Sequence, residues 1–219
     1  ASQSQGGPLG AVMAQPLDEN TFYSWPTWSP DGMKLGASLV EVKDGQPEIS
    51  VQVVDVATGI SSTVFQNEAP ALIAEGTPHY LYWSPDSRTL AVLASTPQGL
   101  TLFAVDTGSL SEPTIIESGA PLYFHWAADG QSMLMHVADE LKLLTRPFGA
   151  SLAQPIETDP GFRTPALSPD GSKMAYLGEG GSVGSIAIAE TGSPIEANSS
   201  NDAGPRAAFA WSPVSGDLA

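Results

Sequence analysis

The strongest constraint on this chain is a short motif that returns along it at nearly constant spacing. The first copy is Trp-Ser-Pro-Asp-Gly at residues 28–32, and the second is Trp-Ser-Pro-Asp-Ser at 83–87. Trp-Ala-Ala-Asp-Gly follows at 126–130 and Leu-Ser-Pro-Asp-Gly at 167–171, and a last copy begins with Trp-Ser-Pro at 211–213. The third residues of successive copies are 55, 43, 41 and 44 residues apart. The chain is therefore a series of repeats of one unit.

Each unit has the pattern of four short strands joined by tight turns. A short apolar stretch such as 80–82 precedes the motif, whose Pro-Asp-Gly step favours a turn. An apolar stretch follows, as at 89–94, then a Gly-containing hairpin and a third stretch, as at 100–105. A fourth stretch closes the unit, as at 62–65. Four strands in a period of about 40–45 residues are typical of propeller blades, so we expect an all-β chain, a β-propeller of four-stranded antiparallel blades.

The spacing also predicts the boundaries of the blades. We expect residues 1–22 to be a flexible N-terminal segment that could donate a closing strand, and 23–219 to form the propeller. The expected blades span about 23–66, 78–117, 121–158 and 162–197, and a fifth begins at 206. Because a propeller closes to cover its edges, we expect these four full repeats and the fifth start to belong to a larger ring. Self-association of two chains is the alternative way to complete the ring.

Two positions of the motif have structural roles in this interpretation. A large ring at the end of each inner strand can pack between adjacent blades, so the motif Trp is expected to be a packing residue. The motif Asp is expected to be a turn residue, because its side chain bonds the backbone nearby.

These residues resemble the repeat of TolB-type, WD40-like propellers. The resemblance rests on the motif copies and on third strands that end in Asp-x-x-x-Gly, as at 55–59, or in Asp-Thr-Gly, as at 106–108. The third unit departs most, with Ala127 and Ala128 in place of Ser and Pro, and the fourth has Leu167 in place of Trp. The resemblance implies a ring of six to eight blades. It also implies a non-catalytic protein-interaction or scaffold propeller of the bacterial cell envelope, with protein or peptide partners.

Two enzymatic alternatives stay open. Similar propellers precede the catalytic domain of prolyl-oligopeptidase-type serine peptidases, where the disc restricts substrate entry. This chain would then be the substrate-gating domain, and the catalytic triad would lie outside it. A propeller hydrolase or lyase that acts through the channel would instead need acids or His ligands on the inner strands, which are mostly apolar here.

Composition excludes several classes of partner. Lys plus Arg number 8 against 24 for Asp plus Glu, which gives a net charge of −16. Nucleic acid and anionic membrane surfaces are therefore excluded as partners, since both need clustered basic residues. The chain has no cysteine, so it has no disulfides and no thiolate sites. No apolar run approaches the roughly 20 residues of a membrane span. The acidic balance and low Lys content favour an extracytoplasmic location, periplasmic or secreted.

No catalytic or metal-binding constellation emerges from the sequence. Gly180-Gly181-Ser182-Val183-Gly184 matches the nucleophile elbow of α/β-hydrolases, but it falls in the expected hairpin of the fourth blade. All three histidines precede it, and none lies four residues from another. We therefore expect no catalytic residue, no metal and no cofactor within the chain.

The best candidate for a binding surface is the mouth of the propeller channel. Loops that enter the inner strands carry aromatic, His and Arg side chains, and Tyr, Trp and Arg are enriched in binding hot spots. The predicted residues are Tyr23, Trp25, His79, Tyr80, Tyr123, His125, Arg163 and Arg206.

Overall fold

The fold consists of four antiparallel β-sheets, which we number as blades 1 to 4. The computed structural model describes residues 20–67, 71–109, 111–128, 130–138, 140–145, 150–151, 156–157, 166–170, 172–177, 182–188, 194–202, 210–214 and 217. Blade 1 contains β1 (Thr21–Trp28), β2 (Lys34–Lys43), β3 (Gln46–Asp55) and β4 (Ser61–Gln66). Blade 2 contains β5 (His79–Trp83), β6 (Thr89–Thr96), β7 (Gly99–Asp106) and β8 (Thr114–Ser118).

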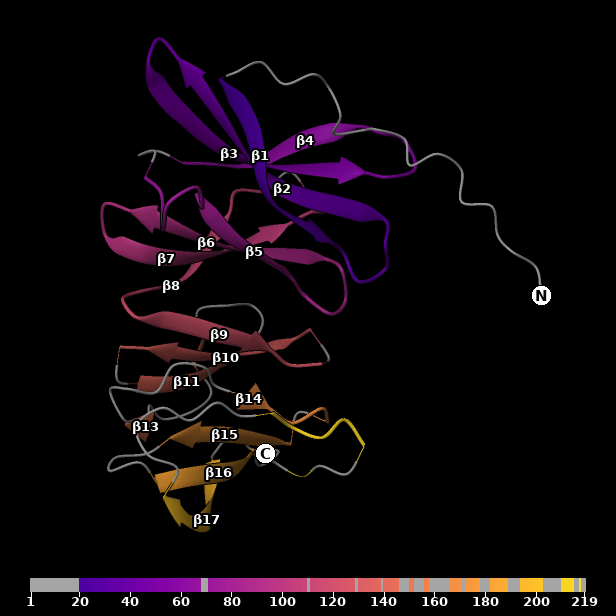
Figure 1. The fold of residues 1–219 in the computed structure, drawn as a ribbon. Coiled ribbons are helices and arrows are strands. Elements are labelled where there is room, and N and C mark those ends of the chain that lie inside the picture. The colour runs from indigo at the N-terminus through magenta and orange to yellow at the C-terminus, as the bar shows by residue number, and fades with distance from the viewer. Residues whose placement is uncertain are drawn as a thin grey trace, which may run out of the picture.

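The remaining two sheets follow the same plan. Blade 3 contains β9 (Leu122–Trp126), β10 (Ser132–Val137), β11 (Glu140–Thr145) and β12 (Ala150–Ser151), and β13 (Ile156–Glu157) also pairs with β11. Blade 4 contains β14 (Ala166–Leu167), β15 (Lys173–Leu177), β16 (Ser182–Ile188) and β17 (Pro194–Asp202). Strands pair in chain order within each blade, and the described residues contain no helix. Figure 1 shows the blades stacked one above the next from blade 1 at the top. The predicted all-β architecture of four-stranded antiparallel blades is confirmed.

The core lies between the blades rather than within one. Side chains of a strand alternate between the two faces of its sheet, so a blade that lies between two others has two faces to bury. One cluster joins blades 1 and 2 and includes Val51 and Leu81, and another joins blades 2 and 3 and includes Leu102 and Met133. A central strand such as β6 is therefore apolar on both sides, and its first six residues are all buried. This sandwiching explains why the sequence shows continuous apolar runs there instead of strict alternation.

The same backbone hydrogen bond closes the motif in every copy. The backbone N–H of the second motif residue donates to the carbonyl five residues later, at 2.8–2.9 Å, in all five copies. In blade 1 the Ser29 hydroxyl also donates to Asp31 Oδ1 at 2.6 Å and accepts from the Lys34 N–H at 2.9 Å. Blades 2 and 4 repeat both bonds through Ser84 and Ser168. The motif Ser and Asp thus close the turn together, which confirms the predicted role of the Asp.

These hydrogen bonds also favour the ionised form of the motif Asp. The Ser168 hydroxyl is the main donor to Asp170 and, with the Ser172 N–H and hydroxyl, lowers the pKa of that carboxyl to about 2. The pKa of Asp31 is lowered in the same way, by the Ser29 hydroxyl first.

Successive motif turns pack on one another across the blades. The Asp31 N–H of blade 1 donates to the Ser87 hydroxyl of blade 2 at 3.0 Å. Ser87 occupies the position of the motif Gly and has a φ of 59°, a backbone conformation that favours glycine. A serine at this position supplies the hydroxyl that accepts this bond from blade 1. In blade 3, a Cβ on Gly130 would lie 3.0 Å from the Asp86 side chain, so a larger residue would push the two turns apart.

The motif Trp side chains at 83 and 211 join their repeats to the preceding blade. Trp83 of blade 2 donates its indole N–H to the Thr27 carbonyl of blade 1 at 3.1 Å, and Trp211 donates to the Ala166 carbonyl of blade 4 at the same distance. Trp83 and Trp126 are 7% and 9% exposed, which confirms the predicted packing role at these two positions. Trp28 is 53% exposed, and the structure describes no blade on that face of blade 1, so its packing role stays a prediction.

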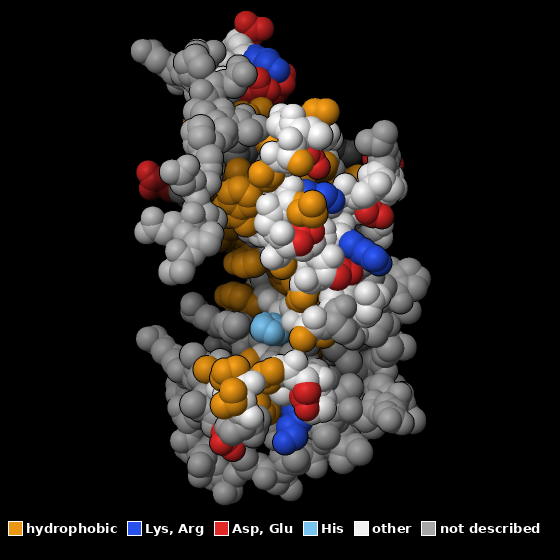
Figure 2. Space-filling view, turned by 90° about the vertical axis from the view of Figure 1, so that its right-hand side faces the viewer, with side chains coloured by type: hydrophobic (Ala, Val, Ile, Leu, Met, Phe, Trp, Pro, Cys, Tyr) orange, Lys and Arg blue, Asp and Glu red, His pale blue; other side chains and the backbone are white. Residues whose placement is uncertain are grey.

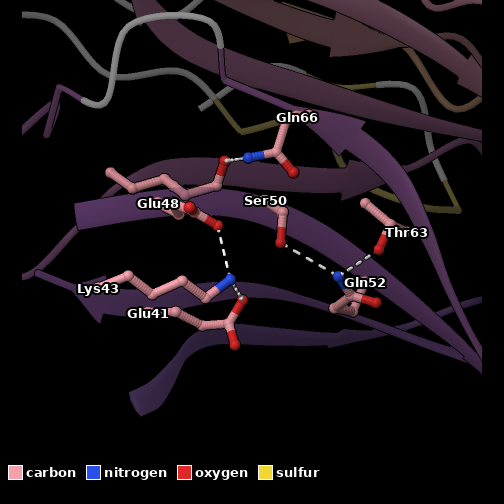
Figure 3. Close-up of polar contacts among 8 residues, drawn as sticks. Glu41, Lys43, Glu48, Ser50, Gln52, Thr63 and Gln66 are labelled. Atoms are coloured by element: carbon pink, nitrogen blue, oxygen red, sulfur yellow. Dashed lines mark hydrogen bonds and ion pairs between the residues drawn. The ribbon is translucent and has the colours of Figure 1, made fainter. Parts of the chain in front are cut away.

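Polar side chains hold the outer part of blade 1. The Gln52 amide donates to the Ser50 hydroxyl at 3.1 Å and to the Thr63 hydroxyl at 2.8 Å, which joins β3 to β4 (Figure 3). At the other end of the sheet, Lys43 pairs with Glu48 at 2.7 Å and with Glu41 at 3.5 Å. Those ion pairs are exposed and contribute little to stability, whereas the buried amide of Gln52 fixes the position of β4.

Candidate binding surface on the inner strands

The inner strands β1, β5 and β9 each begin a blade, and they carry most of the residues predicted at the channel mouth. Alternation along β5 points His79, Leu81 and Trp83 toward blade 1, and Tyr80 and Tyr82 toward blade 3. The position of a residue along β5 therefore decides which of the two neighbouring blades its side chain faces.

Four aromatic side chains form pairs across the blades, and we call them the inner aromatic surface. Trp25 meets Tyr80 edge to face with ring centroids 4.8 Å apart, and Tyr82 meets Phe124 in the same way at 5.3 Å. Trp25 is 38% exposed and Tyr82 is 46% exposed, so one ring of each pair is held by its neighbour while it faces solvent. Rigid aromatic rings that are half exposed suit protein contacts, because little side-chain freedom is lost on binding.

The backbone of β1 positions the first of these rings. The pairing of β1 with β2 is irregular between Ser24 and Thr27, and Trp25 within this irregularity has a φ of 54°. A positive φ is rare for a residue with a side chain, and bulges of this kind redirect a side chain. The Ser24 hydroxyl donates to the Gly76 carbonyl at 3.1 Å, which ties the irregular segment to the loop before β5.

Exposed hydrophobic side chains gather on the upper blades. Figure 2 shows hydrophobic side chains along the upper and middle part of the stack, and a further group near its lower end. Large exposed hydrophobic residues of blades 1 and 2 include Phe22, Trp25, Trp28, Met33, Tyr82 and Ile115. Of this set, only Trp25 and Tyr82 belong to the inner aromatic surface.

His79 does not lie on the inner aromatic surface. Its side chain is fully buried between blades 1 and 2, where Nδ1 lies 2.9 Å from the Ser38 hydroxyl and the ring meets Phe65 edge to face. Burial lowers the pKa of His79 to about 4, so the ring is neutral at ordinary pH. It is a packing residue of the interface between these two blades.

The other predicted residues are divided between β1, β9 and segments that the structure does not describe. Tyr23 is half-buried on β1, and His125 is exposed on β9. Tyr123 stacks on His136 of β10 at 6.1 Å between ring centroids. Arg163 and Arg206 lie outside the described residues. The structure therefore joins Trp25 and Tyr80 directly and leaves Tyr123 and His125 on the side of blade 3 that faces away from them.

Sequence reasoning missed Tyr82 and Phe124. Both stand two residues after another apolar member of the same strand, Tyr80 in β5 and Leu122 in β9, so each shares a face with that residue. This i, i+2 spacing was the available signal, but it does not reveal which face meets the next blade.

Two of the constellations considered in the sequence, a metal site and the hydrolase-like motif, fall at least partly on described residues. No group of three or more His, Cys, Asp or Glu side chains is placed to hold a metal within the part of the chain that the structure describes. Of the hydrolase-like motif, Ser182 to Gly184 lie in β16, paired with β15 and β17, and the two preceding glycines lie outside the described residues. Ser182 thus begins a strand instead of standing on a strand-to-helix turn. In the same described part, no helix is long and apolar enough to cross a membrane.

Comparison with known proteins identifies the fold. No family model matches the sequence, and no curated protein is similar enough to it to count as a relative. The β-propeller domain of the Trilobed protease from Pyrococcus furiosus is similar with a TM-score of 0.56 and 11% identity, over 81% of this chain and 57% of that chain. The C-terminal WD40 domain of Sif2 is similar with a TM-score of 0.57 and 15% identity, over 91% of this chain and 54% of that chain.

TolB from Acinetobacter baumannii gives a lower TM-score of 0.43, with 18% identity over 76% of this chain and 40% of that chain. The chain thus spans little more than half the length of the first two structures. At these identities the likeness concerns the fold alone. The chain is a β-propeller domain of WD40-like architecture, made of several four-stranded blades.

Proposed function

We propose that this chain is a non-catalytic protein-binding propeller of the TolB-like kind, working outside the cytoplasm, and that the inner aromatic surface contacts the partner. The observation that carries the proposal is the pair of half-exposed rings, Trp25 and Tyr82, each held edge to face by a neighbouring blade. Such rings bind through area and shape, which suits a protein or peptide better than a small polar substrate.

Charge narrows the class of partner. The chain has a net charge of −16, so its long-range field attracts basic proteins and repels nucleic acid. The partner proposed here is therefore a protein or peptide with a basic or neutral contact face.

A capture experiment tests the proposal. The chain is immobilised and exposed to a periplasmic or secreted protein fraction of the source organism, and bound proteins are identified by mass spectrometry. The double variant Trp25→Ala/Tyr82→Ala should lose the specific partner, because both exposed rings are removed. Met33→Ala is the matched control, since Met33 is 60% exposed and lies outside the inner aromatic surface. A partner captured equally by the double variant would contradict the proposal.

The second candidate is a propeller that gates access to a peptidase domain. It is favoured by the similarity to the propeller of the Pyrococcus furiosus protease and to a prolyl endopeptidase, the latter with a TM-score of 0.55 over 32% of that chain. The intact mass of the natural protein and its labelling by a fluorophosphonate probe separate the two candidates. A mass larger by a catalytic domain, together with labelling of a serine, would select the peptidase; a mass that fits only further blades, without labelling, would select the binding module.

A further inference from the structure

A groove runs along the outer rim between blades 1 and 2, away from the inner strands. It has a volume of about 890 Å³ and is bounded by β4 on one side and by β7, β8 and their connecting loops on the other. It arises because the two blades are offset. The Phe65 ring of β4 rests on Phe103 of β7 at 4.8 Å, so β4 stands over the third strand of blade 2 and leaves the fourth, β8, uncovered. Ile115 on β8 is 59% exposed as a result.

The groove side of β8 can be derived from the register. Ile115 pairs with Phe103, and Ser118 pairs with Thr101, so Ile115 and Ser118 share the face of blade 2 that is turned toward blade 1. Ser118 and Thr101 are joined by a hydroxyl contact of 3.0 Å. Glu117 points the other way and pairs with Lys142 of blade 3 at 3.1 Å. The floor of the groove is thus an apolar residue followed by hydroxyl groups.

The free edge of β4 forms one wall. Among the described residues β4 pairs only with β3, so its second edge carries backbone groups that no described strand pairs with. The Ile60 carbonyl accepts from the Asp55 N–H, and the Asn67 N–H donates to the Ile49 carbonyl, so both residues face β3. Backbone groups alternate between the two edges of a strand, apart from the irregularity in the pairing of β3 with β4. The N–H and C=O groups of Ser61, Thr63 and Gln66 therefore point to the free edge. The sequence of β4, Ser-Ser-Thr-Val-Phe-Gln, contains no Pro, Lys or other charged residue that would protect an edge from pairing.

The residues that line the groove define the ligand chemistry. Hydroxyl groups come from Ser62, Thr63, Thr96, Thr101 and Ser118, and the apolar part from Val64, Phe103 and Ile115. Its charged lining residues are Asp106 and Glu112, both acidic, without Lys or Arg. At one end, the Asn67 side chain is 8% exposed, and its amide nitrogen has no hydrogen-bond acceptor among the described residues. A backbone with alternating side chains and a basic group fits this combination.

We propose that the groove binds an extended peptide segment, which adds to blade 1 as a fifth strand on β4, covers Ile115 and places a basic side chain near Asp106 and Glu112. Strand addition of this kind draws its affinity from main-chain hydrogen bonds and its specificity from alternate side chains. This site is separate from the inner aromatic surface and does not depend on the function proposed for it.

The test uses the peptide acetyl-Lys-Val-Thr-Val-Thr-Lys-amide with a fluorescent label. Fluorescence polarisation measures its dissociation constant, and hydrogen exchange measures the amides of β4. Binding should protect the amides of Ser61, Thr63 and Gln66. The same peptide with alternate amides N-methylated keeps its side chains but loses donors on one edge, so its affinity should fall by at least about tenfold.

Paired variants keep the test independent of folding. Ile115→Lys should weaken peptide binding by about tenfold or more, because it places a cation and a long chain on the floor. Met33→Lys is the matched control, since Met33 is 60% exposed and lies outside the groove, and it should leave binding unchanged. Both variants should melt at the wild-type temperature. Glu112→Lys should weaken binding several-fold, and the Trp25→Ala/Tyr82→Ala variant should not affect it.

Three results would overturn the proposal. The first is failure of the peptide to bind at millimolar concentration. The second is that the N-methylated peptide binds as tightly as the unmodified peptide, or that the Ile115→Lys variant binds the peptide as tightly as the wild-type protein does. The third is concentration-dependent dimerisation of the protein alone with protection of the same amides, because the occupant of the edge would then be β4 of a second copy.

Discussion

Trp28 and Trp83 occupy the same position of the same motif, yet one is 53% exposed and the other 7% exposed. Both end an inner strand, and both are followed by a Ser that closes the same turn. Trp83 faces blade 1 and donates to the Thr27 carbonyl. Trp28 faces the opposite side of blade 1, where the structure describes no blade. The local turn is thus a property of the motif, whereas burial of the ring is a property of the blade before it.

This difference divides each repeat into two kinds of interaction. The bonds of the motif turn are made within one repeat. They are the same at the interface between blades 1 and 2, which we call the filled interface, and at the Trp28 face of blade 1, where the structure describes no blade and which we call the open face. The Trp packing, the Ser38–His79 contact and the core cluster exist only where two blades meet. The stability of the filled interface should therefore respond to changes that leave the open face unaffected.

The largest expected difference comes from removing the two rings. Trp83→Ala should lower the free energy of unfolding by about 3–5 kcal/mol, because it leaves a cavity in the core between blades 1 and 2. Trp28→Ala should lower it by less than about 1 kcal/mol, because a half-exposed ring has few contacts to lose. Urea unfolding followed by tryptophan fluorescence and circular dichroism measures both values. Equal losses would mean that Trp28 is covered in solution, and the contrast between the two faces would disappear.

A pH dependence should distinguish the filled interface next. Burial holds the pKa of His79 at about 4, below its ordinary value of 6.5. Between these pH values the unfolded chain binds a proton that the folded chain does not, so the free energy of unfolding should fall as the pH drops from 6.5 to 4. The loss from this group amounts to about 3 kcal/mol at most. Denaturant unfolding at a series of pH values measures it.

The control for this pH effect is His79→Leu. This variant loses the contact with Ser38 and is less stable at neutral pH, but its stability should change less between pH 6.5 and 4. An unchanged slope would assign the pH dependence to other groups. The motif carboxylates act at lower pH, since their pKa values lie below the ordinary Asp value and their contribution is lost as the pH falls toward 2.

The motif serines should show no difference between the two regions. Ser84 and Ser29 are 0% and 2% exposed, and each donates to its motif Asp and accepts from the backbone five residues later. Replacement of either by Ala should cost about 1–3 kcal/mol, because a buried N–H loses its side-chain acceptor. Thermal or urea unfolding of the two variants gives the comparison. A loss confined to Ser84→Ala would show that the neighbouring blade contributes to the turn.

The smallest effect concerns ion pairs. Lys142 of blade 3 joins Glu117 of blade 2, and their side chains are 21% and 27% exposed, whereas Lys43 and Glu48 within blade 1 are 55% and 51% exposed. Lys142→Met should lower the free energy of unfolding by about 0.5–1 kcal/mol at low salt, and Lys43→Met by less. High salt should reduce the difference between the two variants in the free energy of unfolding, which urea unfolding at low and high salt measures. A larger loss for Lys43→Met would contradict the view that contacts between blades matter more.

The sequence predicted the elements that depend on local chemistry. The turn at Asp31 followed from the preferences of Pro, Asp and Gly, and the fourth strand expected at 62–65 is part of β4. The packing of Trp83 followed from the size of the ring and its place in the repeat. These features need only residues that are close in the chain or repeated along it.

Apart from the Trp packing, features that depend on two blades were beyond the sequence. Tyr82 and Phe124 form a pair only because β5 and β9 lie side by side. Alternation along one strand does not show which of its two faces meets the next blade. His79 begins an inner strand in the sequence, as a residue at the channel mouth would, yet its ring is buried between blades 1 and 2 beside Ser38 and Phe65. The groove beside β4 depends on the offset of two sheets, which no residue pattern encodes.

The direction of the Trp contacts has a consequence for synthesis. Trp83 donates to the Thr27 carbonyl, and Trp211 donates to the Ala166 carbonyl. Each acceptor lies earlier in the chain than its Trp, so it leaves the ribosome first. Within a blade the strands are neighbours in sequence and can pair as they emerge. A nascent chain can therefore complete one blade, and the next repeat then docks on a surface that already exists. Folding would proceed from the N-terminus by successive addition, and the rings of Trp83 and Trp211 would each dock on a blade that is already formed.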